Sequence, residues 1–171
     1  MNSLVKFVLN IIPRSILTRL SFLLKPLIKI YLSGNKYVDP IDGSSFRKFL
    51  PYGYNNVREN ALSPSTFSLE RHRLLWLYLK NETDFFNKDL KVLHFAPEAA
   101  FLEKFKKLKN ISYDTIDLDS PLANIKADIC DLPLDNESYD FILCNHVLEH
   151  IIDDKKAIQE LYRVLKKDGI G

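Results

Sequence analysis

Residues 91–169 alternate short apolar runs with helical patterns, and this alternation constrains the fold more than any other feature of the chain. Three apolar runs, at 91–95, 111–116 and 139–144, are predicted to be strands. A helix is predicted after the third run, ending at Gly169. Apolar runs separated by helical segments indicate parallel strands that are buried on both faces. The sequence therefore predicts an α/β fold, a Rossmann-like parallel sheet with helices on both faces.

The loops at the carboxyl ends of these strands are the expected ligand site, because ligands of open parallel sheets bind there. These loops lie at 95–100, 117–121, 127–131 and 144–150. Asp117 ends the second predicted strand, where a carboxylate can accept from both ribose hydroxyls of a nucleoside, and Asp119 is the neighbour that could substitute. Asp128 opens a later turn, where it can accept from an adenine amino group. Acidic residues at strand ends are also common solvated caps, so the interpretation depends on the order and spacing of the two.

Four segments of this region resemble the motifs of class I S-adenosylmethionine-dependent methyltransferases. They read Ala-Asp-Ile-Cys-Asp-Leu-Pro-Leu at 127–134, Ser-Tyr-Asp-Phe-Ile at 138–142, His-Val-Leu-Glu-His at 146–150 and Glu-Leu-Tyr-Arg-Val-Leu-Lys-Lys-Asp-Gly at 160–169. The Asp-Leu-Pro and Leu-Glu-His elements are the more specific ones. The resemblance implies S-adenosylmethionine as the cofactor and methyl transfer to a small-molecule or sugar-like acceptor as the activity.

The resemblance also implies that the loop after the first strand, at 94–100, cradles the methionine part of the cofactor. Family members place glycines there, whereas this loop contains none. Ala96 stands where the backbone passes nearest to the ligand. Glu98 is expected either to bind the amino group of the cofactor or to cap the helix predicted at 101–109. The full set of expected cofactor-binding residues is His94, Phe95, Ala96, Glu98, Asp117, Leu118, Asp128, Ile129, Cys144 and Asn145.

His146 is the candidate catalytic residue, because it lies with Asn145 just past the third predicted strand, close to where the methyl group should point. Methyl transfer from a sulfonium is an in-line displacement, in which positioning supplies most of the rate. A base is needed only when the acceptor must lose a proton. The alternative for His146 is a structural hydrogen bond, and His150 is expected to face the helix interface.

Residues 37–67 are expected to form a small module that is built on two similar turns. Asp39 and Asp42 in one turn, and Ser63 and Thr66 in the other, have the spacing of paired zinc-ligand turns. Hydroxyls are poor zinc ligands and two carboxylates make a weak site, so no zinc is expected. The alternative is that the two turns merely look alike. Similarity to a bacterial methyltransferase subgroup with cysteines at these positions implies that a structural zinc has been lost.

Two segments complete the middle of the chain. Residues 46–53 interleave aromatic and basic side chains, and either stack a base or a sugar or form the small core of the module. Residues 68–79 are expected to form an amphipathic helix. This helix opens the third expected domain, at 68–171, which corresponds to the N-terminal part of the methyltransferase domain.

The first domain, at 1–36, is rich in Leu and Ile and carries basic charges only. Pro13 and Pro26 are expected to divide it into helices of about a dozen residues, because proline breaks a helix interior. No uninterrupted apolar run approaches the ~20 residues that a spanning helix needs. Two interpretations stay open. The helices either pack on the catalytic domain or, through residues 1–33, lie on the surface of an anionic membrane.

Composition limits the remaining classes. A formal net charge of +2 is too small to indicate a nucleic-acid partner. Cys130 and Cys144 are the only cysteines, and the chain has no secretory signature. This favours a reducing compartment, the cytoplasm, with contact to the inner face of the membrane as the open alternative.

The sequence ends at Gly171, whereas a complete fold of the family would continue with three more strands. The expectation is therefore an incomplete sheet that holds the first four strands, as in a truncated or split reading frame. A sheet that ends here would leave an apolar edge exposed. The alternative to an active enzyme is an inactive remnant, or a partner-binding fragment that needs another chain to complete its sheet.

Overall fold

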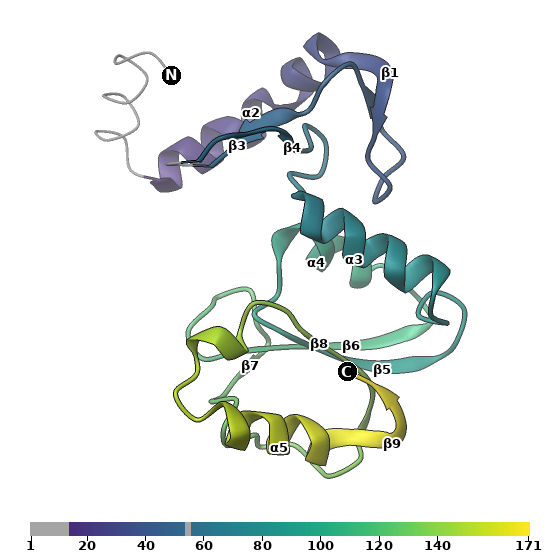
Figure 1. The fold of residues 1–171 in the computed structure, drawn as a ribbon, viewed down its shortest axis with the longest axis vertical. Helices are drawn as coiled ribbons and strands as arrows, with labels where there is room; N and C mark the ends of the chain where they lie inside the picture. Colours follow the sequence, from purple (N-terminus) through teal and green to yellow (C-terminus); the bar gives the residue numbers. More distant parts are fainter. Residues whose placement is uncertain (1–13, 54–55) are drawn as a thin grey trace. The chain divides into compact units, whose positions relative to one another are not determined.

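The computed structural model describes residues 14–53 and 56–171. The chain forms two compact units, one up to Trp76 and one from Leu77 onwards (Figure 1). The helix expected at 68–79 is α3 (Glu70–Asn81), and it spans the division between the units.

The second unit contains a five-stranded, fully parallel sheet with the order β7-β6-β5-β8-β9. The strands are β5 (Leu90–Phe95), β6 (Ile111–Asp117), β7 (Ile125–Lys126), β8 (Tyr139–Cys144) and β9 (Leu165–Ile170). The helical elements after β5 are α4 (Ala99–Phe105), the 3₁₀ turn η1 (Leu148–His150) and α5 (Asp154–Val164). The three predicted strands are confirmed within a residue at each end. The fold is α/β and Rossmann-like.

Two features of this sheet differ from the expectation of four strands. The helix predicted to end at Gly169 ends at Val164, and β9 begins at the next residue. Leu165 is extended because it pairs with Tyr139 of β8, so tertiary pairing overrides the helical propensity of the following lysines. The additional strand, beyond the four that were expected, is β7. Its two residues are too few to produce a periodic signal in the sequence.

Both faces of the central strand β5 are buried, as expected of a parallel sheet. Leu93 and Phe95 point to the face that α5 covers, in a core that includes Ile142 and Val164. The alternate residue His94 points to the opposite face, against the rings of Phe101 and Phe105 on α4. The helices α4 and α5 lie on opposite faces of the sheet (Figure 1). Because successive side chains of a strand point to opposite faces, the position of a residue along β5 determines which side of the sheet its side chain can reach.

The first unit combines α2 (Arg14–Tyr31) with two antiparallel pairs of strands. These strands are β1 (Ser33–Val38) with β2 (Ser45–Phe46), and β3 (Leu50–Tyr52) with β4 (Arg58–Leu62). Leu32, Phe46 and Phe49 form the core of this unit, with Ile28 of α2 packed against them. Phe46 and Phe49 therefore form part of a small hydrophobic core, which was one of the two interpretations of residues 46–53, whereas Tyr52 is exposed.

The expected break at Pro26 is wrong, because α2 continues through it. Proline removes one backbone hydrogen bond and crowds the preceding turn, and this is why the sequence indicated a break there. Packing of Ile28 and Leu32 on the core holds the residues after the proline in register with the rest of the helix. Pro13 and the helix expected before it lie outside the described residues. No helix in the described ranges has the length and apolarity needed to cross a membrane.

The two similar turns of the first unit meet around a buried carboxylate. Asp39 is fully buried, and its Oδ2 accepts hydrogen bonds from the hydroxyls of Thr66 and, at 3.4 Å each, Ser65 and Ser68. Its Oδ1 accepts from the amide N–H of Ile41 at 3.0 Å. A network of hydroxyl groups thus surrounds a buried carboxylate at the two turns that have the spacing of zinc-ligand turns.

The other two positions of the predicted set join the same network. Asp42 accepts from Ser65 Oγ at 3.2 Å, and Ser63 Oγ lies 3.1 Å from Ser65 Oγ. Across residues 14–53 and 56–171, no three His, Cys, Asp or Glu side chains are grouped so that they could hold a metal ion. That the module holds no zinc stays a prediction, and metal analysis of the purified chain is the measurement that checks it.

Replacing Asp39 by alanine is expected to destabilise the first unit by about 3 kcal/mol, because the hydroxyls of buried Ser65 and Ser68, the hydroxyl of half-buried Thr66 and one amide lose their acceptor. The matched control is Asp42→Ala, at an exposed position of the same turn, which should cost less than about 1 kcal/mol. Hydrogen-exchange mass spectrometry of residues 33–69 measures both. An opening free energy for Asp39→Ala equal to that of the parent chain would show that the buried carboxylate does not stabilise the unit.

Candidate functional site

A pocket lies at the carboxyl ends of β5 and β6, the edge that the topology of the sheet predicts. Its walls are mostly apolar, and two carboxylates, those of Asp117 and Asp128, belong to its lining. The lining residues are Phe95, Ala96, Ile116, Asp117, Leu118, Ala127, Asp128, Ile129, Val147 and Ile151. Residues from three strand ends and from the segment after β8 therefore surround one cavity.

Asp117 is held in place by its own loop. It is the last residue of β6 and is half-buried. Its Oδ1 accepts from the amide N–H groups of Asp119 at 2.9 Å and Ser120 at 2.7 Å. Among the described residues, no hydrogen-bond donor contacts Oδ2. A carboxylate with one oxygen fixed by the backbone and the other open is suited to accept hydrogen bonds from a ligand.

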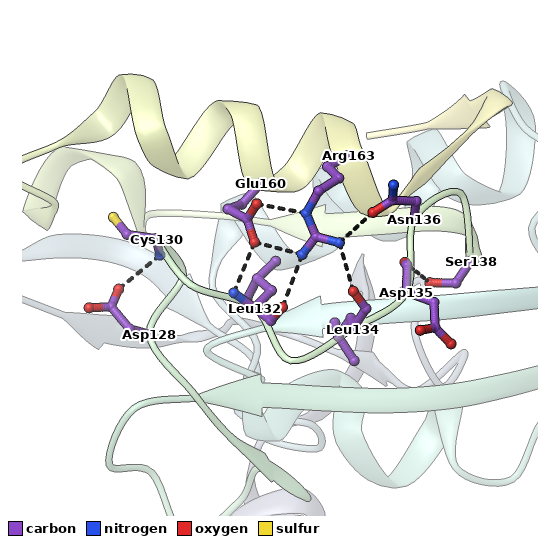
Figure 2. A network of polar contacts seen from close by, with 9 residues as sticks. All are labelled: Asp128, Cys130, Leu132, Leu134, Asp135, Asn136, Ser138, Glu160 and Arg163. Atoms are coloured by element: carbon purple, nitrogen blue, oxygen red, sulfur yellow. Dashed lines mark hydrogen bonds and ion pairs between the residues drawn. The ribbon is translucent and has the colours of Figure 1, made fainter.

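Asp128 and Ile129 form the wall of the pocket on the side of the Asp-Leu-Pro segment. Asp128 Oδ1 accepts from Cys130 N–H at 2.8 Å, which closes a tight turn (Figure 2). The Asp128 side chain is exposed, whereas Ile129 is buried in the main core. The turn therefore presents a carboxylate to solvent beside an apolar surface.

An ion pair on α5, between Arg163 and Glu160, holds the segment that follows this turn through hydrogen bonds (Figure 2). Arg163 contacts Glu160 through two parallel hydrogen bonds of 2.7 Å, from Nε to Oε1 and from Nη2 to Oε2. Arg163 also donates to the carbonyls of Leu132 at 2.9 Å and Leu134 at 2.7 Å, and to Asn136 Oδ1 at 2.8 Å. Glu160 Oε2 accepts from Leu132 N–H at 2.9 Å. We call this pair and its contacts the α5 clamp.

The α5 clamp has a clear electrostatic signature. The hydrogen bonds from Arg163 lower the pKa of Glu160 to about 2, and those to Glu160 raise the pKa of Arg163. Both side chains are mostly covered, with exposed fractions of 18% for Glu160 and 30% for Arg163. The clamp thus fixes the path of the chain directly after the Asp128 turn.

Ala96 occupies a backbone conformation that favours glycine. Its φ is +45°, and its N–H donates to Ile116 O at 2.9 Å, which ties the loop after β5 to the end of β6. Left-handed backbone costs a residue with a Cβ roughly 1–2 kcal/mol. The absence of glycine in this loop therefore leaves strain at the point where β5 enters the pocket.

Ala96→Val is expected to destabilise the second unit by about 2 kcal/mol, because a β-branched side chain is strongly disfavoured at positive φ. Ala96→Gly should leave stability within about 0.5 kcal/mol, since relief of strain offsets the greater freedom of the unfolded chain. Urea unfolding followed by circular dichroism compares the two. If valine were tolerated as well as glycine, the left-handed conformation of Ala96 would be excluded.

His94 and Glu98 lie on the face of the sheet away from the pocket. His94 is fully buried, with Nδ1 at 2.7 Å from Tyr113 Oη and Nε2 at 2.7 Å from Glu98 Oε2. Burial, assisted by the charge of Glu98, raises the pKa of Tyr113. Glu98 is the N-cap residue of α4, but its side chain makes no capping hydrogen bond. The Glu98 carboxylate contacts His94 instead, so neither residue belongs to the pocket lining.

The residues after β8 lie beside the loop that contains Ala96, because Cys144 pairs with Phe95 in the sheet. Cys144 is half-buried, and burial raises the pKa of its thiol to about 11. The Nδ2 of Asn145 is buried and has no hydrogen-bond partner in the described part of the chain. A buried donor without a partner is costly, so this amide is a candidate ligand contact.

His146 is exposed at the end of β8, outside the pocket lining. It has a φ of +56°, and its Nδ1 lies 3.2 Å from Glu149 Oε1. This contact is the main cause of the lowered pKa of Glu149. His150, expected at the helix interface, is exposed instead, because Val147 and Leu148 are the residues of this turn that pack on the core.

The structure therefore brings together six of the predicted site residues around one pocket. These are Phe95, Ala96, Asp117, Leu118, Asp128 and Ile129. Cys144 and Asn145 follow at the adjacent strand end, whereas His94 and Glu98 lie on the opposite face. Sequence reasoning missed Val147 and Ile151, which complete the apolar wall.

A Rossmann-like sheet with acidic residues at the ends of its strands is typical of proteins that bind a nucleotide-type cofactor. Residues 82–171 match the family described as the methyltransferase domain. Because this match covers more than half of the chain, the chain belongs to the methyltransferase domain family.

Two curated relatives are similar in sequence. The ubiquinone/menaquinone biosynthesis C-methyltransferase UbiE of Campylobacter jejuni is 30% identical over 118 residues, which cover 57% of this chain and 46% of that protein. The uncharacterized methyltransferase YcgJ of Bacillus subtilis is 45% identical over 38 residues, which cover 22% of this chain and 15% of that protein. The chain thus matches less than half the length of either relative.

Two solved structures align with part of the chain. A SAM-dependent methyltransferase from Aquifex aeolicus aligns with a TM-score of 0.45 and 17% identity, over 57% of this chain and 58% of that one. A putative sarcosine dimethylglycine methyltransferase from Galdieria sulphuraria aligns with a TM-score of 0.49 and 21% identity, over 79% of this chain and 49% of that one.

Proposed function

We propose that this chain is an S-adenosylmethionine-dependent methyltransferase domain and that the pocket at the ends of β5 and β6 binds the cofactor. The observation that carries the proposal is Asp117, whose carboxylate is fixed through one oxygen and open at the other in the pocket wall. In a member of the methyltransferase family, an acidic residue at this strand end is suited to accept from the ribose hydroxyls.

The residues of the pocket fit such a group chemically. Asp117 and Asp128 supply acceptors for hydroxyl and amino donors, and Phe95, Leu118 and Ile129 supply apolar surface. The unpartnered Nδ2 of Asn145 supplies a donor for the carboxylate of an amino-acid moiety. When bound, the cofactor supplies an electrophilic methyl group.

The residues of this chain would act mainly by positioning, since an in-line displacement gains most of its rate from alignment of the reacting atoms. His146 is exposed at the end of β8 and hydrogen-bonded to Glu149, which orients its ring. An acceptor whose nucleophile must lose a proton would transfer that proton to the free ring nitrogen of His146. The proposed acceptor is a small molecule or a sugar-like compound.

Thermal unfolding with different nucleotides tests the proposal. S-adenosylmethionine and S-adenosylhomocysteine are expected to raise the Tm of the full chain, because a ligand at a hundred times its Kd stabilises the folded state by about 2.7 kcal/mol. ATP and NAD⁺, which share adenine and ribose but lack the methionine part, should give much smaller shifts. Equal or larger shifts with ATP or NAD⁺ would contradict a methyltransferase pocket.

A further inference from the structure

The helix α2 has apolar residues on two sides, and only one of these sides packs against the core of its unit. Ile28 and the adjoining Leu32 pack against the core of the unit. In the part of α2 whose side chains are described, Leu23, Leu27 and Ile30 form a second stripe, with exposed fractions of 75%, 64% and 75%. Their i, i+4, i+7 spacing places them on one face of the helix. Leu24 and Tyr31 lie beside this stripe and are also exposed.

We call Leu23, Leu24, Leu27, Ile30 and Tyr31 the α2 stripe. A contiguous patch of large exposed apolar side chains marks an interaction surface on a globular domain. The stripe contains five such residues, whereas smaller sets lie elsewhere, Leu74, Leu77 and Tyr78 on α3 and Ile158 and Tyr162 on α5. The α2 stripe is therefore a candidate binding surface.

The charges near the α2 stripe indicate what kind of partner it binds. Residues 1–48 contain eight Lys or Arg and only two acidic residues, whereas the whole chain has a net charge of +2. The guanidinium of Arg47 stacks over the ring of Tyr31 at 4.5 Å, and Lys48 beside it is exposed. An apolar stripe with cations at its edge is complementary to a partner that has an apolar layer beneath an anionic surface.

A bilayer that contains anionic lipid has this chemistry. A basic amphipathic helix lies in the interfacial plane, with its apolar face at the boundary between headgroups and acyl chains. Basic residues beside it are attracted by the anionic headgroups. Tyrosine suits the same depth, because its ring is apolar and its hydroxyl is polar.

We propose that the α2 stripe binds reversibly to the surface of an anionic membrane, with Arg47 and Lys48 among the headgroups. This surface belongs to the first unit and does not depend on the cofactor pocket of the second. The result of the membrane experiment is therefore independent of any result with S-adenosylmethionine.

Co-sedimentation of the full chain with vesicles tests the proposal. Vesicles of equimolar phosphatidylcholine and phosphatidylglycerol are expected to pellet the chain, and vesicles of phosphatidylcholine alone should pellet far less. The variant Leu23→Ser/Leu27→Ser/Ile30→Ser should lose at least about tenfold in partitioning to the anionic vesicles. The matched control, Ile158→Ser/Tyr162→Ser, removes exposed apolar side chains from α5 and should pellet like the parent chain.

Three outcomes would overturn the proposal. The first is equal pelleting of the triple variant and the parent chain. The second is equal binding to neutral and anionic vesicles, since the basic charges would then have no role. The third is a dimer in light scattering that the triple variant converts to a monomer, because the stripe would then be occupied by a second copy. Circular dichroism verifies that each variant keeps the helix content of the parent.

Discussion

Replacing Asp117 by alanine is expected to weaken binding of S-adenosylmethionine by about a hundredfold, close to 2.7 kcal/mol. The open oxygen of Asp117 is the proposed acceptor for the ribose hydroxyls, and hydrogen bonds to a charged group are stronger than neutral ones. The substitution also frees the amide groups of Asp119 and Ser120 that fix the loop. Isothermal titration of the parent and the variant measures the change in Kd.

Two further variants separate the contact with the ligand from other effects. Asp119→Ala removes the same charge two residues away, at an exposed position outside the pocket lining, and should change Kd by less than about threefold. Asp117→Asn keeps an oxygen for the two loop amides but loses the charge, so an intermediate loss is expected. Equal losses for Asp117→Ala and Asp119→Ala would assign the effect to net charge rather than to ribose binding.

Arg163→Met is expected to lower the free energy of unfolding of the second unit by about 2–3 kcal/mol. The substitution keeps the aliphatic stem but removes the donors to the Leu132 and Leu134 carbonyls and the partner of Glu160. Partly covered acceptors left without a donor carry a desolvation penalty in addition to the lost bonds. Urea unfolding measures the loss. Lys155→Met, which removes an exposed cation from the same helix, should have little effect.

The α5 clamp also predicts a pH dependence with a definite sign. The pKa of Glu160 is lowered from 4.5 to about 2 in the folded chain. A carboxyl group whose folded pKa is depressed contributes stability that is present above its unfolded pKa. This contribution is lost as the pH falls from about 4.5 to about 2. The parent chain should therefore lose more stability over this range than Arg163→Met does. Identical pH slopes for the two proteins would contradict the clamp.

The three central strands could be predicted from sequence because their signal is local. Each is a short apolar run, and β5 and β8 are buried on both faces, which leaves a continuous pattern in the sequence. Once the strand ends are known, the topology of a parallel sheet places Asp117 and the Asp128 turn at one edge. Most of the pocket follows from this rule without knowledge of any side-chain contact.

The features that the sequence did not predict depend on contacts between distant segments. Leu165 begins β9 because it pairs with Tyr139, and α2 continues past Pro26 because Ile28 and Leu32 pack on the core. The α5 clamp joins Arg163 to residues near position 134, and no spacing within the helix indicates this. In the first two cases, tertiary packing outweighed local propensity.

His94 differs from these cases, because a local signal in the sequence indicates its position. It alternates with Leu93 and Phe95 along β5, so a period-2 pattern already places it on the face opposite Phe95. Its prediction as a cofactor residue rests on its place in the loop motif, which does not take into account the face of β5 to which its side chain points. Glu98 follows His94 to that face through their hydrogen bond.

Isothermal titration of the full chain with S-adenosylmethionine tests the central claim most directly. We predict saturable binding at one site per chain, competed by S-adenosylhomocysteine and strongly weakened in Asp117→Ala. A chain that is folded by circular dichroism, yet gives no saturable binding at millimolar cofactor, would contradict the assignment of this pocket.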